Sequence, residues 1–207
     1  ALFHKDISNY FVSGLVPVTV TRNGLPYTFQ LTSYMNGDKG KVEGFELGYQ
    51  QFYDSLPGFL SGFGLAANYT KLYNSGGSST PNVPNPDPTA VALSAGLPLE
   101  GMSPDSYNVQ LMYEKYGIST RLAYNWRSRF LLTSSAANVN QPVWSENYGQ
   151  LDGSLFYSFL DHYKAGIQAT NLLNQTTFLD AGYLNFHPRY DYIQTDRKIS
   201  FILRAQW

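Results

Sequence analysis

The chain has 207 residues, with 14 Lys+Arg and 15 Asp+Glu, so its formal net charge is −1. This balance excludes the basic surface of a nucleic-acid-binding protein and a strongly charged tail. The absence of cysteine excludes disulfides and thiolate metal sites, and without a run of about 18 apolar residues the sequence predicts no transmembrane helix.

Apolar and polar residues alternate with a period of two along most of the chain, which predicts β-strands and almost no helix. The last strand shows the pattern clearly, because Ile199, Phe201 and Leu203 fall on the face opposite to Ser200 and Arg204. In chain order, the eight predicted strands are Leu2–Val12, Phe45–Gln50, Phe63–Thr70, Tyr107–Lys115, Ile118–Phe130, Leu151–Phe159, Tyr163–Thr170 and Lys198–Trp207.

Short and long connections alternate strictly between these strands. The short connections are 54–58, 116–117 and 160–162, and the long ones are 13–41, 71–106, 131–148 and 173–197. The first long connection contains a strand-like stretch, Tyr27–Met35. In an up-and-down meander this order places all short turns at one end and all long loops at the other. Outer-membrane barrels have this asymmetry, so the sequence predicts an all-β, transmembrane, antiparallel up-and-down β-barrel.

A soluble β-sandwich or a lipocalin-like barrel would also have alternating strands. Its solvent-facing surface would need many Lys and Glu side chains, but charged residues are only 14% of this chain, against about 25% in soluble domains. The polar rows consist instead of Asn, Gln, Ser, Thr and Gly with a few Arg, as suits the wet lumen of a membrane barrel. The membrane barrel is therefore favoured.

Aromatic residues reach 16% of the chain, and several gather in the long loops. Trp144 and Tyr148 lie in one loop, and Tyr183 and Tyr190 lie in the last one. Sugar sites combine aromatic rings, which cover apolar ring faces, with polar groups that bind hydroxyls. These four residues are therefore candidate ligand-binding residues. The alternative is that they form an interfacial girdle or pack one loop on another.

Arginines of the predicted lumen row are the second group of candidates. Arg127 and Arg129 follow Arg121 along this row, and Glu114 is expected to face Arg121 across the short turn. Such pairs commonly neutralise the barrel wall, so a ligand role for Arg127 and Arg129 is the less usual alternative.

No motif for catalysis, a cofactor or a metal ion stands out. The stretch Gly62–Ala67 matches a loose G-x-G-x-x-A pattern, but it lies inside an alternating strand and not between a strand and a helix. His187 with Asp191 or Asp196 is the only candidate for a catalytic cluster, and no nucleophile accompanies it. We expect no enzymatic activity, no cofactor and no metal site.

Several stretches carry a family resemblance in their order along nearly the whole chain. Among them are Phe3–Tyr10, Val42–Gln51, Leu97–Ser103, Arg121–Arg127, Gly149–Asp152 and Thr170–Asn174. Together they resemble the C-terminal barrel region of TonB-dependent receptors of the outer membrane. The terminal Trp207 also resembles the signal that the barrel-assembly machinery recognises. The resemblance implies that residues 1–207 correspond to the last eight strands of a 22-stranded barrel, without the plug domain.

The same resemblance implies a function for the whole protein. It would bind a scarce solute outside the bacterium and import it across the outer membrane. TonB and an energising inner-membrane complex would act through the missing N-terminal part. The tyrosine-rich loops resemble those of oligosaccharide receptors more than those of ferric siderophore receptors.

The expected orientation places the long loops outside the cell and the short turns and the C-terminus in the periplasm. Outer-membrane lipid would surround the apolar rows. The residues alone leave one alternative open, a self-contained eight-stranded barrel with a structural or adhesive role, because eight strands can close on themselves.

Overall fold

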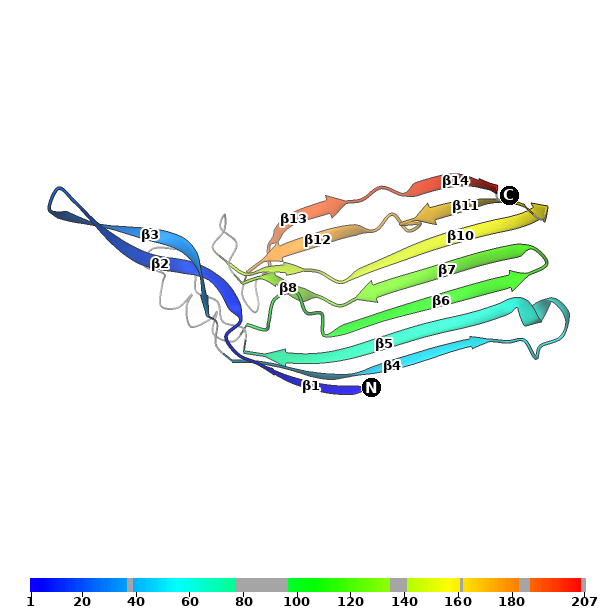
Figure 1. Ribbon diagram of the computed structural model, residues 1–207, viewed down its shortest axis with the longest axis horizontal. Helices are drawn as coiled ribbons and strands as arrows, with labels where there is room; N and C mark the ends of the chain where they lie inside the picture. Colours follow the sequence, from blue (N-terminus) through cyan, green and yellow to red (C-terminus); the bar gives the residue numbers. More distant parts are fainter. Residues whose placement is uncertain (37–38, 77–96, 135–140, 161, 183–186, 206–207) are drawn as a thin grey trace.

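The computed structural model describes residues 1–36, 39–76, 97–134, 141–160, 162–182 and 187–205. Eight strands form one antiparallel sheet in which the strands follow one another in chain order (Figure 1). Across the sheet they are β1 (Leu2–Ile7), β4 (Gly40–Phe52), β5 (Phe63–Ser75), β6 (Asp105–Lys115), β7 (Ile118–Arg127), β10 (Tyr148–Leu160), β11 (Tyr163–Thr170) and β14 (Lys198–Ala205). The predicted all-β, up-and-down arrangement of eight strands is confirmed.

The eight strands form an open sheet. β1 and β14 lie at its two edges, and among the described residues they do not pair with each other. The sheet therefore has the form of a barrel segment, and this finding speaks against a barrel that these eight strands close by themselves. In the described part of the chain, no helix is long and apolar enough to span a membrane.

Several predicted strand ends were wrong. β4 begins at Gly40 and not at Phe45, and β5 ends at Ser75 and not at Thr70. β1 ends at Ile7 and not at Val12, because Asn9 takes a left-handed conformation (φ 56°) that interrupts the extended chain. β7 ends at Arg127 and not at Phe130, because the backbone N–H of Ser128 donates to the carbonyl of Asp105 and the chain then leaves the sheet. Phe130 is consequently buried outside the main sheet.

The short connections gather at one end of the sheet, at the right of Figure 1. Between β6 and β7, Tyr116 and Gly117 both have positive φ (55° and 75°), as the two central residues of a type I′ hairpin turn require. Between β4 and β5 the chain forms one 3₁₀-helical turn, η1 (Gly58–Gly62). The predicted separation of short and long connections is therefore present in the structure.

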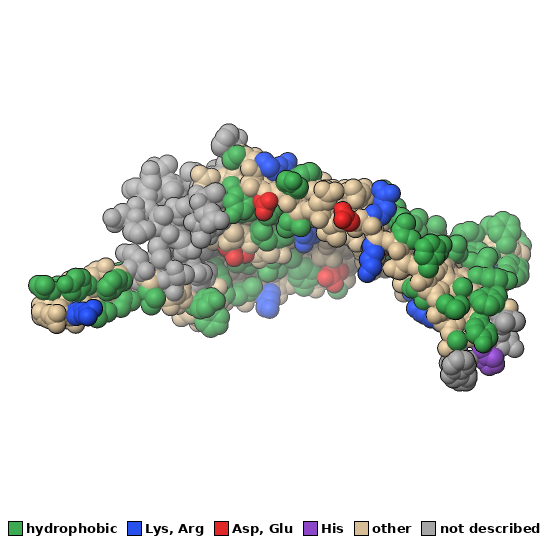
Figure 2. All heavy atoms as spheres, turned by 90° about the horizontal axis from the view of Figure 1, so that it is seen from above, with side chains coloured by type: hydrophobic (Ala, Val, Ile, Leu, Met, Phe, Trp, Pro, Cys, Tyr) green, Lys and Arg blue, Asp and Glu red, His purple; other side chains and the backbone are tan. Residues whose placement is uncertain are grey.

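The long connections contain regular structure that the sequence analysis missed or only noted as strand-like. β2 (Phe11–Arg22) and β3 (Leu25–Asn36) form a long hairpin that projects from the loop end (Figures 1 and 2). A second, four-stranded sheet lies at the same end, and we call it the loop sheet. Its strands, in order, are β13 (Arg189–Gln194), β12 (Thr176–Ala181), β9 (Val143–Ser145) and β8 (Phe130–Thr133).

The strand register sorts the side chains of the main sheet onto two faces. Leu65, Leu111 and Leu122 lie directly opposite one another on adjacent strands, and Leu111 and Leu122 are 46% and 44% exposed. The intervening residues form a polar face, where Arg121 lies 3.6 Å from Glu114, the contact that the sequence predicted. We call the first face the outward face, because exposed leucines suit a hydrocarbon environment.

Aromatic pairs border the apolar band of the outward face. Towards the loop end, Tyr107 stacks on Trp126 with ring centroids 5.1 Å apart. Towards the short turns, Phe63 meets Tyr113 edge-on at 4.9 Å. Rows of aromatic side chains at both rims of an apolar band are typical of membrane-spanning barrels.

Asn171 ties the end of β11 to the chain segments around it. The residue is 1% exposed, its Oδ1 accepts the backbone N–H of Gln175, and its Nδ2 donates to the carbonyls of Gln175 and Thr195. Its own N–H donates to Asp152 Oδ1 at 2.9 Å. Positive φ at Asn171 (52°) lets the chain turn sharply there.

We predict that Asn171→Ala destabilises the protein by about 3 kcal/mol, because it leaves buried backbone groups without partners. The free energy of unfolding of the full-length protein in denaturant measures this effect. Asn174→Ala is the matched control, since Asn174 has the same φ (52°) but an exposed side chain. Equal losses of unfolding free energy in the two variants would show that the backbone conformation, and not the side-chain hydrogen bonds of Asn171, causes the effect.

The two faces predict opposite outcomes for neighbouring substitutions. Leu122→Arg should impair folding into a bilayer by about 2–4 kcal/mol, because it places a charge among the apolar side chains of the outward face. Arg121→Ala, on the polar face, should leave folding nearly unchanged. Folding titrations in lipid vesicles measure both, and equal effects would contradict the assignment of the faces.

Candidate functional site

The loop end of the structure contains the described candidate residues. Tyr183 lies outside the described residues. The other five are Arg127 at the end of β7, Arg129 before β8, Trp144 in β9, Tyr148 at the start of β10 and Tyr190 in β13. Their common location agrees with the sequence analysis, and their role in binding stays a prediction.

The loop sheet has its own small apolar core. Val143, Leu179 and Ala181 are buried together, and Tyr190 packs against them. This packing is one of the two roles that the sequence left open for Tyr190. The core holds β9, β12 and β13 together and so fixes the position of Trp144.

Arg129 and Trp144 form the centre of the candidate site. The guanidinium carbon of Arg129 lies 4.6 Å from the Trp144 ring centroid, a favourable cation–π geometry. The indole N–H of Trp144 donates to the carbonyl of Gly182 at 3.1 Å, which fixes the orientation of the ring. Arg129 Nη2 also lies 3.0 Å from Nδ1 of His187. The prediction that Arg129 lies in the lumen row was wrong, because β7 ends before it.

Two carboxylates beside this centre were missed by the sequence analysis. Glu146 Oε1 lies 2.8 Å from Arg129 Nε, and Asp180 Oδ1 lies 3.2 Å from Arg189 Nη1. The Arg189 guanidinium also covers the ring of Phe178, with 4.2 Å to the centroid. Arg129 and Arg189 therefore each contact both a carboxylate and an aromatic ring.

No sequence signal identified the Asp180–Arg189 pair. The two residues are direct cross-strand neighbours in β12 and β13, but the register shifts between Leu179 and Asp180. A period-two pattern cannot locate such an irregularity. Asp180 is only 8% exposed, so its charge depends on Arg189 for compensation.

Arg127 and Tyr148 lie apart from the Trp144 centre. They are directly opposite each other on β7 and β10, and the Arg127 guanidinium covers the ring of Phe130 at 4.6 Å. The Tyr148 hydroxyl donates to Gln150 Oε1 at 2.7 Å, and the Gln150 amide donates to Asp152. These groups form a polar ladder on the face opposite to the apolar band.

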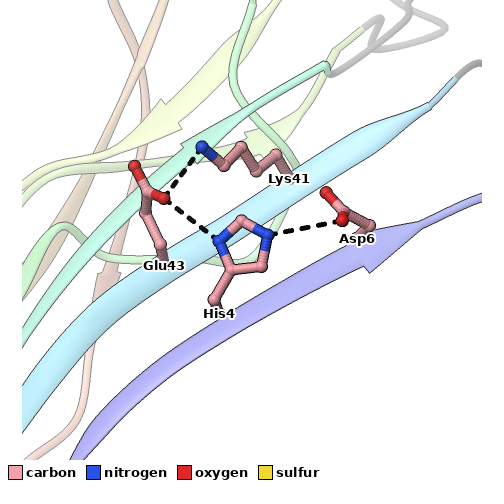
Figure 3. A network of polar contacts seen from close by, with 4 residues as sticks. All are labelled: His4, Asp6, Lys41 and Glu43. Carbon is pink, nitrogen blue, oxygen red and sulfur yellow. Dashed lines mark hydrogen bonds and ion pairs between the residues drawn. The ribbon is translucent and has the colours of Figure 1, made fainter.

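A separate charged network lies near the loop end of the outward face, on β1 and β4 (Figure 3). His4 lies 3.3 Å from both Asp6 and Glu43, and Lys41 lies 2.9 Å from Glu43. All four side chains are exposed, so solvent screens the pairs and their contribution to stability is small. In the part of the chain that the structure describes, no group of His, Asp and Glu side chains is arranged to hold a metal ion.

Burial raises the pKa of the Glu146 carboxyl, and a hydrogen bond with Asp180 raises it further. The attraction of Arg129 opposes this increase without cancelling it. A raised pKa in the folded state means that the protonated form of Glu146 fits the loop sheet better than the ionised form.

The sign of the shift predicts the pH dependence of the loop sheet. Glu146 therefore stabilises the loop sheet at pH values below its ordinary pKa of 4.5. This stabilisation is lost as the pH rises through the raised pKa of the folded state. Hydrogen exchange of the β9 and β12 amides, corrected for intrinsic rates, should show this loss. Glu146→Gln should remove it, whereas Glu114→Gln, at the short-turn end, should leave it in place. A persistent loss in Glu146→Gln would assign the effect to another group.

A family model described as TonB dependent receptor-like, beta-barrel, matches residues 1–172. No curated protein matches the chain significantly. Among solved structures, the siderophore receptor PirA from Acinetobacter baumannii is similar in 83% of this chain, with a TM-score of 0.48 and 17% sequence identity. The chain spans 24% of the length of that receptor.

The family match agrees with the main features of the fold. The open, up-and-down sheet has short turns at one end, long loops at the other and an apolar face between two aromatic rims. The match extends from β1 through β11 and so includes seven of the eight strands of the main sheet. The chain belongs to the TonB-dependent receptor-like β-barrel family, whose members lie in the bacterial outer membrane.

Proposed function

We propose that the whole protein is a TonB-dependent receptor that imports a scarce solute, and that this solute is an oligosaccharide. The observation that carries the proposal is the loop-sheet centre, where Trp144 is held beside Arg129 and Glu146. An indole ring next to planar hydrogen-bonding groups suits a sugar, which has apolar ring faces and hydroxyl edges. This role is consistent with membership of the receptor family.

The charge balance of the centre favours a neutral solute over an anionic ferric chelate. Arg129 is paired with Glu146, and Arg189 is paired with Asp180. An anionic ligand would be attracted by arginines without carboxylate partners. Paired arginines and carboxylates instead offer donors and acceptors in fixed positions, as hydroxyl recognition needs. Uptake of a ferric siderophore is the alternative.

The remaining parts of the proposal follow from the family. The long loops and the loop sheet face the outside of the cell, and the short turns face the periplasm. TonB and its inner-membrane complex supply energy through the N-terminal part of the receptor, which lies outside residues 1–207. Arg127 and Tyr148, on the polar face of β7 and β10, bind the solute transiently on its way through the lumen.

Trp144→Ala in the full-length receptor should weaken oligosaccharide binding about tenfold, because it removes the ring that stacks on the sugar. Isothermal titration with malto-, xylo- and chito-oligosaccharides identifies the bound class and measures the change. Trp126→Ala is the matched control, since Trp126 lies on the outward face and stacks on Tyr107. The Trp126→Ala receptor should bind the oligosaccharide with the same affinity as the unchanged receptor.

Ferric citrate and a ferric hydroxamate are titrated in parallel. Binding of a ferric chelate without binding of any oligosaccharide would overturn the oligosaccharide assignment and leave the receptor role in place. Binding of neither class, in a receptor that folds and inserts, would contradict both assignments of the solute.

A further inference from the structure

Two neighbouring grooves hollow the outward face of the sheet on β6, β7, β10, β11 and β14. The first has a volume of about 480 Å³ and the second about 510 Å³. Both are lined by Leu155 and Ile167, which are directly opposite each other on β10 and β11. These two side chains therefore form a ridge between the grooves.

Small residues create the floors of the grooves. In the first groove, Gly153 and Ala169 are cross-strand neighbours, and Leu122 and Leu172 stand beside them. A Cβ atom added to Gly153 would lie 3.3 Å from Leu172 and 3.5 Å from Leu122, so these two leucines pack closely around the glycine. In the second groove, Ala165 has the corresponding position.

Apart from the hydroxyls of Tyr113 and Tyr157, the grooves present one outward hydroxyl group, and it is already paired. Thr120 lines the first groove, and its hydroxyl donates to the backbone carbonyl of Ser154 at 2.7 Å. The other outward side chains in both grooves are aliphatic or aromatic. Beyond the two tyrosine hydroxyls, an apolar occupant therefore meets no outward polar group that its binding would leave unpaired.

Each groove has one tyrosine in its lining. Tyr113 lines the first groove near the end of β6, and Tyr157 lines the second near the end of β10. Tyrosine rings concentrate at the level of lipid headgroups, where the ring is in the apolar region and the hydroxyl meets polar groups. Each groove thus combines an apolar lining with one ring of the kind found at headgroup level.

We propose that this face binds one glycerophospholipid from the leaflet at the short-turn side. One acyl chain lies in each groove, on either side of the Leu155–Ile167 ridge, and the headgroup lies between Tyr113 and Tyr157. The grooves are continuous with the apolar face that contacts the membrane, so lipid is the occupant always present there. The proposal concerns the outer wall and is independent of the solute that the receptor imports.

The test uses the full-length receptor, extracted in mild detergent and supplied with dipalmitoyl phosphatidylethanolamine. Native mass spectrometry counts the phospholipid retained on each receptor. Ala169→Leu fills the first groove and displaces about two methylene groups of an acyl chain, so retention should fall about tenfold. Ala165→Leu should act in the same way through the second groove.

Ala67→Leu is the matched control, because Ala67 lies on the outward face of β5 and lines neither groove. It should retain as much phospholipid as the unchanged receptor. Gel mobility before and after heating shows whether each variant is a folded barrel. If Ala169→Leu does not fold, Leu155→Ala, which removes the ridge, takes its place and should also lower retention.

Three outcomes would overturn the proposal. Equal retention in the groove variants and in Ala67→Leu would show that the lipid binds elsewhere. An unchanged receptor that retains no phospholipid would show that the grooves are not a specific site. Retention of a second receptor copy, lost only in the groove variants, would assign the face to protein association instead.

Discussion

The structure depends on one constraint, which is that no backbone polar group in a hydrocarbon layer can be left without a partner. The main sheet meets this constraint by continuous antiparallel pairing from β1 to β14. On β5, residues Gly64 to Lys71 pair with β4 on one side and with β6 on the other. The register shift in the pairing of β10 with β11 falls between Ser158 and Leu160, next to a short turn. Irregular backbone is thus confined to the ends of these strands.

The pairing also fixes which side chains meet the membrane. Because adjacent strands keep one register, the leucines of β5, β6 and β7 align in a row and the polar residues align on the other face. The two aromatic rims and the phospholipid grooves both follow from this alignment. A shift of one residue in any strand would place charges such as Arg121 on the apolar face.

Beyond the apolar band the constraint relaxes, and the chain uses other means to order the loops. The loop sheet has short strands, a core of three buried residues and arginines that each contact a carboxylate and a ring. Asn171 replaces regular pairing with side-chain hydrogen bonds where the chain leaves β11. Here individual side chains, and not a repeating ladder of backbone hydrogen bonds, determine the geometry.

The sequence by itself determined the eight strands, their order, their two faces and the end at which the long loops lie. It could do so because the period-two pattern and the alternation of connection lengths depend only on neighbouring residues. Even the Glu114–Arg121 contact was predictable, since a two-residue turn joins their strands. Only the tertiary structure decided that Arg129 leaves the lumen row for Trp144 and that Asp180 and Arg189 form a pair. The two contacts join residues that are 15 and 9 positions apart through short, irregular strands, and no local pattern specifies such a register.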